Sequence, residues 1–179
     1  MNWPKYKSSI VVITIVLTLV VLGGSHFFWQ QYALDKPLAQ VIQAIDGIET
    51  LTFDNGDKNE SPKNIHITLN NVTNLQKTYQ STNDSIIKIL GSKKYKIIIH
   101  DHRTPELEQL YYSMHYHIEE AIFTGKFGVM AEIIQNKAIA ANTKAQVYID
   151  ADSLYVQLMS DNGNLYMVLP RQFARPEVK

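Results

Sequence analysis

Hydrophobic residues form one continuous block near the start of the chain. Residues 10–22 are almost wholly apolar, and a short break at residues 23–26 separates them from Phe27, Phe28 and Trp29. A helix over residues 10–29 is about 30 Å long, which matches the hydrocarbon core of a bilayer. Aromatic side chains before and after the block suit the two membrane interfaces. The pattern predicts a transmembrane helix over residues 10–29.

A cleavable signal peptide is the alternative for this block. Two lysines, Lys5 and Lys7, precede it, and the small residues 23–25 could form a cleavage site. An uncleaved anchor is favoured because a signal peptide does not need the second aromatic group at residues 27–29. The same lysines orient the span by the positive-inside rule. We therefore expect residues 1–9 in the cytoplasm and the rest of the chain outside it, so that the protein is a single-pass protein of the cell membrane.

The next part of the chain alternates between helical and strand patterns. Apolar residues three and four apart predict a juxtamembrane helix within residues 30–47, and strict alternation predicts strands over 48–53, 65–69 and 95–99. Between the last two strands, Thr73 to Gln76 has the spacing of a capping box that opens a helix, and Gly91 is expected to end it. Residues 64–100 therefore predict a β-α-β unit with parallel strands.

Two helices and three strands are predicted for the second half. Thr104 and Pro105 have the cap and first-turn positions of a helix start, and a stripe of apolar residues follows until Gly125 interrupts it. A second helix is expected up to about residue 141. Alternating patterns then predict an antiparallel meander, in which Asn162-Gly163 has the composition of a type I′ hairpin turn. The predicted strands cover residues 146–150, 154–159 and 165–169.

These elements predict an α+β domain over residues 48–170. About six strands are expected in one mixed sheet, with the helices on one of its faces. Residues 171–179 have no periodicity and are expected to form a flexible tail.

Composition narrows the classes of function. The 179 residues contain 17 Lys and Arg against 17 Asp and Glu, so the chain has no net charge that would favour nucleic acid, and we expect no nucleic-acid partner. There is no cysteine, which excludes disulfides, thiolate metal sites and cysteine nucleophiles. Six histidines and the carboxylates are the remaining candidate metal ligands.

Three histidines form the best candidate metal site. His66 lies on one predicted strand, and His100 and His102 lie at the end of its parallel neighbour, so the three imidazoles could share a face and reach a zinc ion. Structural or solvent-exposed histidines are the favoured interpretation. His115 and His117 cannot chelate one ion on a helix, because they lie about 200° apart around its axis.

Other candidate chemistry is weaker. Asp150 and Asp152 flank a predicted turn and fit turn chemistry better than a calcium loop. Nucleophile-elbow, phosphate-loop, dinucleotide-binding and zinc-protease motifs do not occur in the sequence. Six of the 10 tyrosines fall on the expected helix after residue 104 and on the last strands, where exposed members could form a protein contact surface. These are Tyr111, Tyr112, Tyr116, Tyr148, Tyr155 and Tyr166.

The sequence thus predicts an anchored domain that binds proteins. We expect an extracytoplasmic protein-binding or assembly component of the cell envelope, held in lipid through residues 10–29, with no catalysis, cofactor or metal. Two alternatives stay open. One is an extracytoplasmic ligand-sensing domain that acts through a membrane partner, and the other is a membrane-tethered metal-dependent enzyme that uses His66, His100 and His102.

Overall fold

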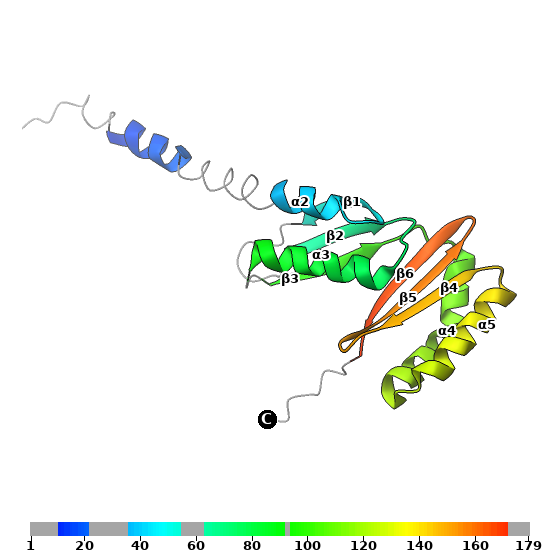
Figure 1. The fold of residues 1–179 in the computed structure, drawn as a ribbon. Coiled ribbons are helices and arrows are strands. Elements are labelled where there is room, and N and C mark those ends of the chain that lie inside the picture. The colour runs from blue at the N-terminus through cyan, green and yellow to red at the C-terminus, as the bar shows by residue number, and fades with distance from the viewer. Residues whose placement is uncertain (1–10, 22–35, 55–62, 92–93, 172–179) are drawn as a thin grey trace, which may run out of the picture. The chain divides into compact units, whose positions relative to one another are not determined.

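The computed structural model describes residues 11–21, 36–54, 63–91 and 94–171 of the chain (Figure 1). The chain divides into two compact units, residues 1–41 and 42–179. In the first unit, residues 11–21 form a helix in which the Thr18 hydroxyl donates to the Thr14 carbonyl oxygen. Among the described residues, no helix combines the length and the apolar character needed to cross a bilayer. The predicted span over residues 10–29 extends beyond the described residues 11–21 at both ends, and residues 172–179 of the predicted tail lie outside the described part.

A three-stranded mixed sheet begins the second unit. Helix α2 (Lys36–Gln43), which crosses the boundary between the two units, has Leu38 and Ile42 buried and lies within the range of the predicted juxtamembrane helix. The sheet follows with β1 (Ile48–Asp54), β2 (Lys63–Leu69) and β3 (Tyr95–His100) in the order β1-β2-β3. β1 pairs antiparallel with β2, and β2 pairs parallel with β3, which confirms the predicted β-α-β unit.

Helix α3 (Leu75–Leu90) connects the two parallel strands. Its N-cap is Asn74, whose side chain accepts from the Lys77 N–H, so the predicted capping box at Thr73 was displaced by one residue. Asn is at least as good a cap as Thr because its short side chain also reaches the first-turn N–H groups. Gly91 ends the helix at φ 63°, as predicted.

Helices α4 (Pro105–Thr124) and α5 (Phe127–Ala140) pack against each other and are joined by Gly125 and Lys126. Thr104 caps α4 as predicted, because its hydroxyl accepts from the Leu107 N–H, and Gly125 adopts the left-handed conformation at φ 76°. The inward stripes of both helices are buried, at Leu107, Tyr111, Met114, Ile118, Ala121, Met130, Ile134 and Ala138.

The predicted antiparallel meander is present. It consists of β4 (Lys144–Ile149), β5 (Ser153–Ser160) and β6 (Gly163–Pro170). The turn between β5 and β6 is Asp161-Asn162, since Ser160 and Gly163 are paired across it. The expected Asn162-Gly163 turn was therefore wrong by one residue, and Gly163 does not have the positive φ that a type I′ turn needs.

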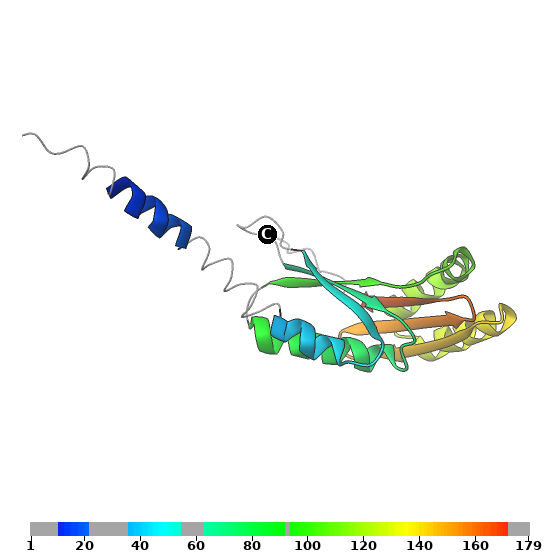
Figure 2. The ribbon, with the colours of Figure 1, turned by 90° about the horizontal axis from the view of Figure 1, so that it is seen from above.

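The six strands form two sheets, which corrects the prediction of one. β3 and β6 come together only at their ends, where the Asn164 N–H donates to the His102 carbonyl oxygen at 3.0 Å. The prediction that all helices lie on one face was also wrong. The α4–α5 pair packs on the meander face that carries Leu154, Val156 and Leu158, whereas α3 approaches β5 from the opposite face (Figures 1 and 2).

Candidate functional site

The β2–α3 connection is fastened to the meander by buried polar side chains. Gln157 of β5 is fully buried, and its side chain accepts from the Leu75 N–H at 3.2 Å and donates to the Val72 carbonyl oxygen at 2.5 Å. The Tyr166 hydroxyl accepts from the Val72 N–H at 3.1 Å. Burial raises the pKa of Tyr166, so the phenol stays protonated. These bonds pair backbone groups that would otherwise be buried without partners.

The segment after β3 is fastened to β6 in a similar way. The carboxylate of Asp101 is 1 % exposed and accepts from Arg103 Nε at 2.7 Å and from the Tyr166 N–H at 2.9 Å. His102 and Asn164 exchange two bonds, because the His102 N–H also donates to Asn164 Oδ1 at 3.1 Å. The β5–β6 hairpin is thereby held against the carboxyl ends of β2 and β3 (Figure 1).

A carboxylate–imidazole pair lies at this junction. His102 Nε2 is 2.7 Å from Glu49 Oε2 of β1, and both side chains are about half exposed. The two residues are brought together by the order β1-β2-β3, although they lie far apart in the sequence. The pair orients the imidazole ring, since the carboxylate fixes one of its nitrogens.

The same residues line an open cleft of about 410 Å³ at the ends of the strands. Its wall is polar, and the described residues that line it include no lysine or arginine. The lining consists of Glu49, Asp161, His102, Asn70, Asn71, Asn162 and Asn164, together with Met159, Ser160, Gly163 and Tyr166. The sequence does not indicate this cleft, because its residues come from four segments and follow no motif.

The structure brings together two of the three histidines considered as metal ligands. His66 Nδ1 lies 2.9 Å from His100 Nε2 on the exposed face of the first sheet, and the two rings stack at 5.2 Å. His102 is instead paired with Glu49. Within the described residues, no three His, Asp or Glu side chains gather as a ligand set. His66 and His100 therefore form a hydrogen-bonded imidazole pair. The ring that accepts this hydrogen bond must be neutral.

Asp150 makes the turn that its sequence context predicts. Its Oδ1 accepts from the N–H groups of Asp152 and Ser153, at 2.9 and 2.7 Å. Its Oδ2 accepts from the Tyr155 hydroxyl at 2.6 Å and from Gln80 Nε2 at 2.9 Å. Desolvation alone would raise the pKa of this carboxyl, but the four hydrogen bonds outweigh it and lower the pKa to about 2. The carboxylate lone pairs are used within the chain, as expected for a structural turn.

The six candidate tyrosines differ in exposure, and Tyr148 is half-buried. Tyr111, Tyr155 and Tyr166 are buried, whereas Tyr112 is 62 % and Tyr116 is 83 % exposed. Phe123, which lies two helical turns after Tyr116 on the same face of α4, is 79 % exposed. On a helix these three positions share one stripe, because they lie four and seven residues apart. We call this stripe, Tyr112, Tyr116 and Phe123, the aromatic face of α4.

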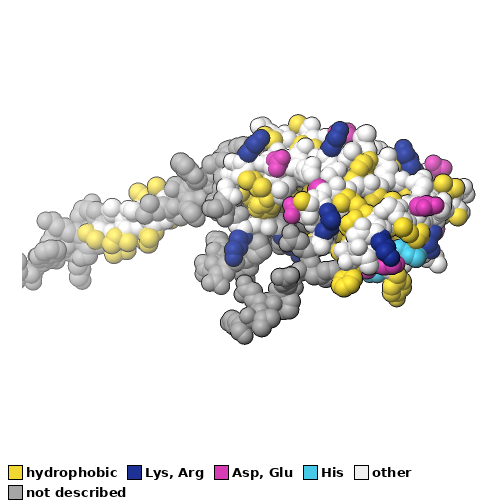
Figure 3. All heavy atoms as spheres, turned by 60° about the horizontal axis from the view of Figure 1, so that its bottom comes forward, with side chains coloured by type: hydrophobic (Ala, Val, Ile, Leu, Met, Phe, Trp, Pro, Cys, Tyr) yellow, Lys and Arg dark blue, Asp and Glu magenta, His cyan; other side chains and the backbone are white. Residues whose placement is uncertain are grey.

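The Lys, Arg, Asp and Glu residues of helix α4 itself have one sign, and Arg103 lies just before the helix, beside Glu108. Helix α4 contains four glutamates, and it has no lysine or arginine. Glu119 lies between Tyr116 and Phe123 on the same stripe, 4.0 Å from the imidazole of His115. Figure 3 shows hydrophobic side chains gathered with acidic and basic ones over the α4–α5 end of the domain. The helix thus combines exposed rings with negative charge.

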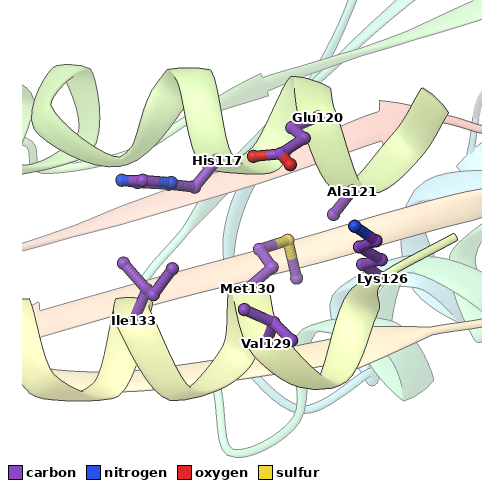
Figure 4. Close-up of a pocket in the computed structure, with 7 residues that line it drawn as sticks. All are labelled: His117, Glu120, Ala121, Lys126, Val129, Met130 and Ile133. Atoms are coloured by element: carbon purple, nitrogen blue, oxygen red, sulfur yellow. The ribbon is translucent and has the colours of Figure 1, made fainter. Parts of the chain in front are cut away.

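The groove between α4 and α5 is nearly filled. Figure 4 shows His117 and Glu120 of α4 facing Val129 and Ile133 of α5 across it. Its free volume is about 20 Å³, which is room for a water molecule and too little for an organic ligand. The helix pair therefore presents an outer surface and not an internal pocket.

Comparison of the chain with protein-family models, with curated proteins and with solved structures found no match.

Proposed function

We propose that the protein is a single-pass membrane protein whose extracytoplasmic domain, residues 48–170, binds another protein of the cell envelope through helix α4, without catalysis of its own. The apolar block over residues 10–29 supports the anchor. The observation that carries the binding role is the exposure of Tyr112 and Tyr116 on one face of one helix. Tyrosine is enriched at interfaces because its ring buries a large area while its hydroxyl keeps a hydrogen-bonding partner.

The chemistry of α4 selects the kind of partner. Its four glutamates and lack of basic residues favour a partner whose contacting face carries lysine or arginine beside apolar residues. A second copy of this chain would place glutamates against glutamates, which costs free energy. The same glutamates would also repel an anionic membrane surface. The favoured occupant is therefore a different protein with a basic contact face.

Co-purification of the full-length tagged protein from solubilised membranes tests this proposal. The variant Tyr112→Ser/Tyr116→Ser removes both rings, and Ile87→Ser is the matched control because Ile87 is an exposed hydrophobic side chain of α3. We expect one partner that is retained by the control, lost by the double variant and released by raised salt. Equal recovery by both variants, or no partner that depends on the tyrosines, would contradict the proposal.

A further inference from the structure

The cleft at the ends of β2 and β3 has the dimensions and the position of a ligand site. Its volume of about 410 Å³ lies within the usual range for small-molecule pockets. It lies beyond the carboxyl ends of two parallel strands, where the connections diverge and leave room for a ligand. The site is separate from the aromatic face of α4, so this inference does not depend on the proposed protein contact.

The walls of the cleft are fixed before any ligand arrives. Asn164 is buried, donates from Nδ2 to Asn70 Oδ1 at 3.0 Å and accepts from the His102 N–H, so one amide ties three segments together. Gly163 approaches His102 so closely that a Cβ atom would be 2.3 Å from its carbonyl oxygen. A preformed wall reduces the ordering cost of binding.

Asn71 projects from a backbone conformation that few residues adopt. Its φ is +50°, in the left-handed region, and its side chain is exposed at the cleft. Asparagine tolerates this region better than most residues, but glycine would be at least as favourable there. The backbone therefore does not by itself require the carboxamide.

The lining chemistry indicates the class of ligand. The carboxamides of Asn71 and Asn162 can donate and accept, whereas those of Asn70 and Asn164 are bonded to each other. The two carboxylates and the imidazole add further hydrogen-bonding groups. Among the described residues that line the cleft, there is no lysine or arginine to neutralise an anion. Glu49 is already paired with His102, which reduces its attraction for a cation. Hydroxyl groups, which donate and accept at once, match this set best.

We propose that the cleft binds a neutral, hydroxyl-rich ligand of mono- or disaccharide size. Glu49 and His102 act together as one oriented acceptor–donor pair, and the exposed Asn71 amide contributes to recognition. Phosphorylated and other anionic sugars are disfavoured by the carboxylate of Asp161, which also lines the cleft.

Saturation-transfer NMR and calorimetry on the full-length protein in detergent test the proposal. The probes are a panel of neutral mono- and disaccharides, with glucosamine and glucose 6-phosphate as charged comparisons. We expect a neutral sugar to bind with a Kd below about 10 mM and the phosphate not to bind.

Two pairs of variants locate the binding. Asn71→Gly removes the amide without straining the backbone, and Asn142→Gly is its control, since Asn142 has φ +49° outside the cleft. Glu49→Gln changes the cleft pair, and Glu119→Gln changes a similarly exposed His–Glu pair on α4. Each cleft variant should weaken binding at least tenfold, and each control should leave it unchanged. Binding of none of the neutral sugars, binding of glucosamine alone, or binding that survives both cleft variants would overturn the proposal.

Discussion

A Cβ atom on Gly163 would lie 2.3 Å from the carbonyl oxygen of His102 and 2.9 Å from Cγ2 of Thr104. The first residue of β6 and the segment after β3 therefore meet backbone to backbone. This contact is where the two sheets of the domain join, because the Asn164 N–H and the His102 carbonyl oxygen are bonded beside it. The position requires glycine for space, not for a left-handed φ.

Gly163→Ala is therefore expected to destabilise the domain. The new methyl group must displace backbone, and such overpacking costs about 1–3 kcal/mol. The control is Gly128→Ala in α5, where a Cβ atom would meet nothing within 4 Å. There alanine should raise the free energy of unfolding, by about 1 kcal/mol at most. Urea unfolding followed by circular dichroism measures both. Equal stability of the two variants would show that the junction can open to admit the methyl group.

Gln157 and Gln146 face each other across β5 and β4 but differ in their bonds. Gln157 bonds the backbone at Val72 and Leu75, whereas Gln146 Oε1 has no hydrogen-bond partner among the described residues. Gln157→Leu leaves buried backbone groups unpaired and should lower the free energy of unfolding by about 2–3 kcal/mol. Gln146→Leu should be neutral or stabilising. A similar loss for both glutamines in chemical denaturation would argue against the fastening role of Gln157.

The Asp150 turn predicts a particular dependence of stability on pH. Its pKa in the folded protein is about 2, below its ordinary value of 3.8. A lowered pKa contributes stability that is present above pH 4 and is lost as the pH falls from about 4 toward 2. Asp150→Asn should lower the free energy of unfolding by about 1 kcal/mol near neutral pH. This difference from the wild type should shrink as the pH falls from about 4 toward 2.

Unfolding curves of the wild type and Asp150→Asn between pH 2 and 6 check this expectation. Asp161→Asn removes a carboxylate from the exposed hairpin turn and controls for the loss of one negative charge. A deficit that stays constant down to pH 2, or one that Asp161→Asn reproduces, would assign the effect to something other than the Asp150 bonds.

The apolar block over residues 10–29 predicts integral membrane association. Full-length protein should stay with membranes after alkaline carbonate extraction, because a buried helix is not released by loss of surface charge. Protease added from outside should digest the domain over residues 48–170 while a short anchored fragment remains. Release by carbonate, or digestion only after the membrane is opened from the cytoplasmic side, would contradict the proposed topology.

The local elements of this domain are predictable from the sequence because each has a local cause. Alternation at Ile65, Ile67 and Leu69 gives β2, and the Thr104 cap with Pro105 begins α4. The helix cap at Asn74 and the turn before Gly163 were each misplaced by one residue, since neighbouring polar residues have similar turn and cap preferences. Element boundaries of this kind are decided by tertiary contacts.

The arrangement of the elements and the cleft is not predictable in the same way. Gln157 has the pattern of an outward-facing strand position and Asn164 follows the predicted turn, yet both are buried, because their amides bond backbone groups of the β2–α3 connection and of the segment after β3. Glu49 meets His102 only through the pairing of β1 with β2 and of β2 with β3, so no spacing in the sequence indicates it.

Site-specific photo-cross-linking in living cells tests the proposed role of α4 most directly. A photoreactive phenylalanine analogue at position 116, on the aromatic face, is compared with the same group at position 87 on α3. We predict an adduct with one basic envelope protein from position 116 that is absent from position 87 and lost when Glu119 and Glu120 are replaced by lysine. Adducts of equal yield from both positions, or adducts only with a second copy of this chain, would contradict the proposal.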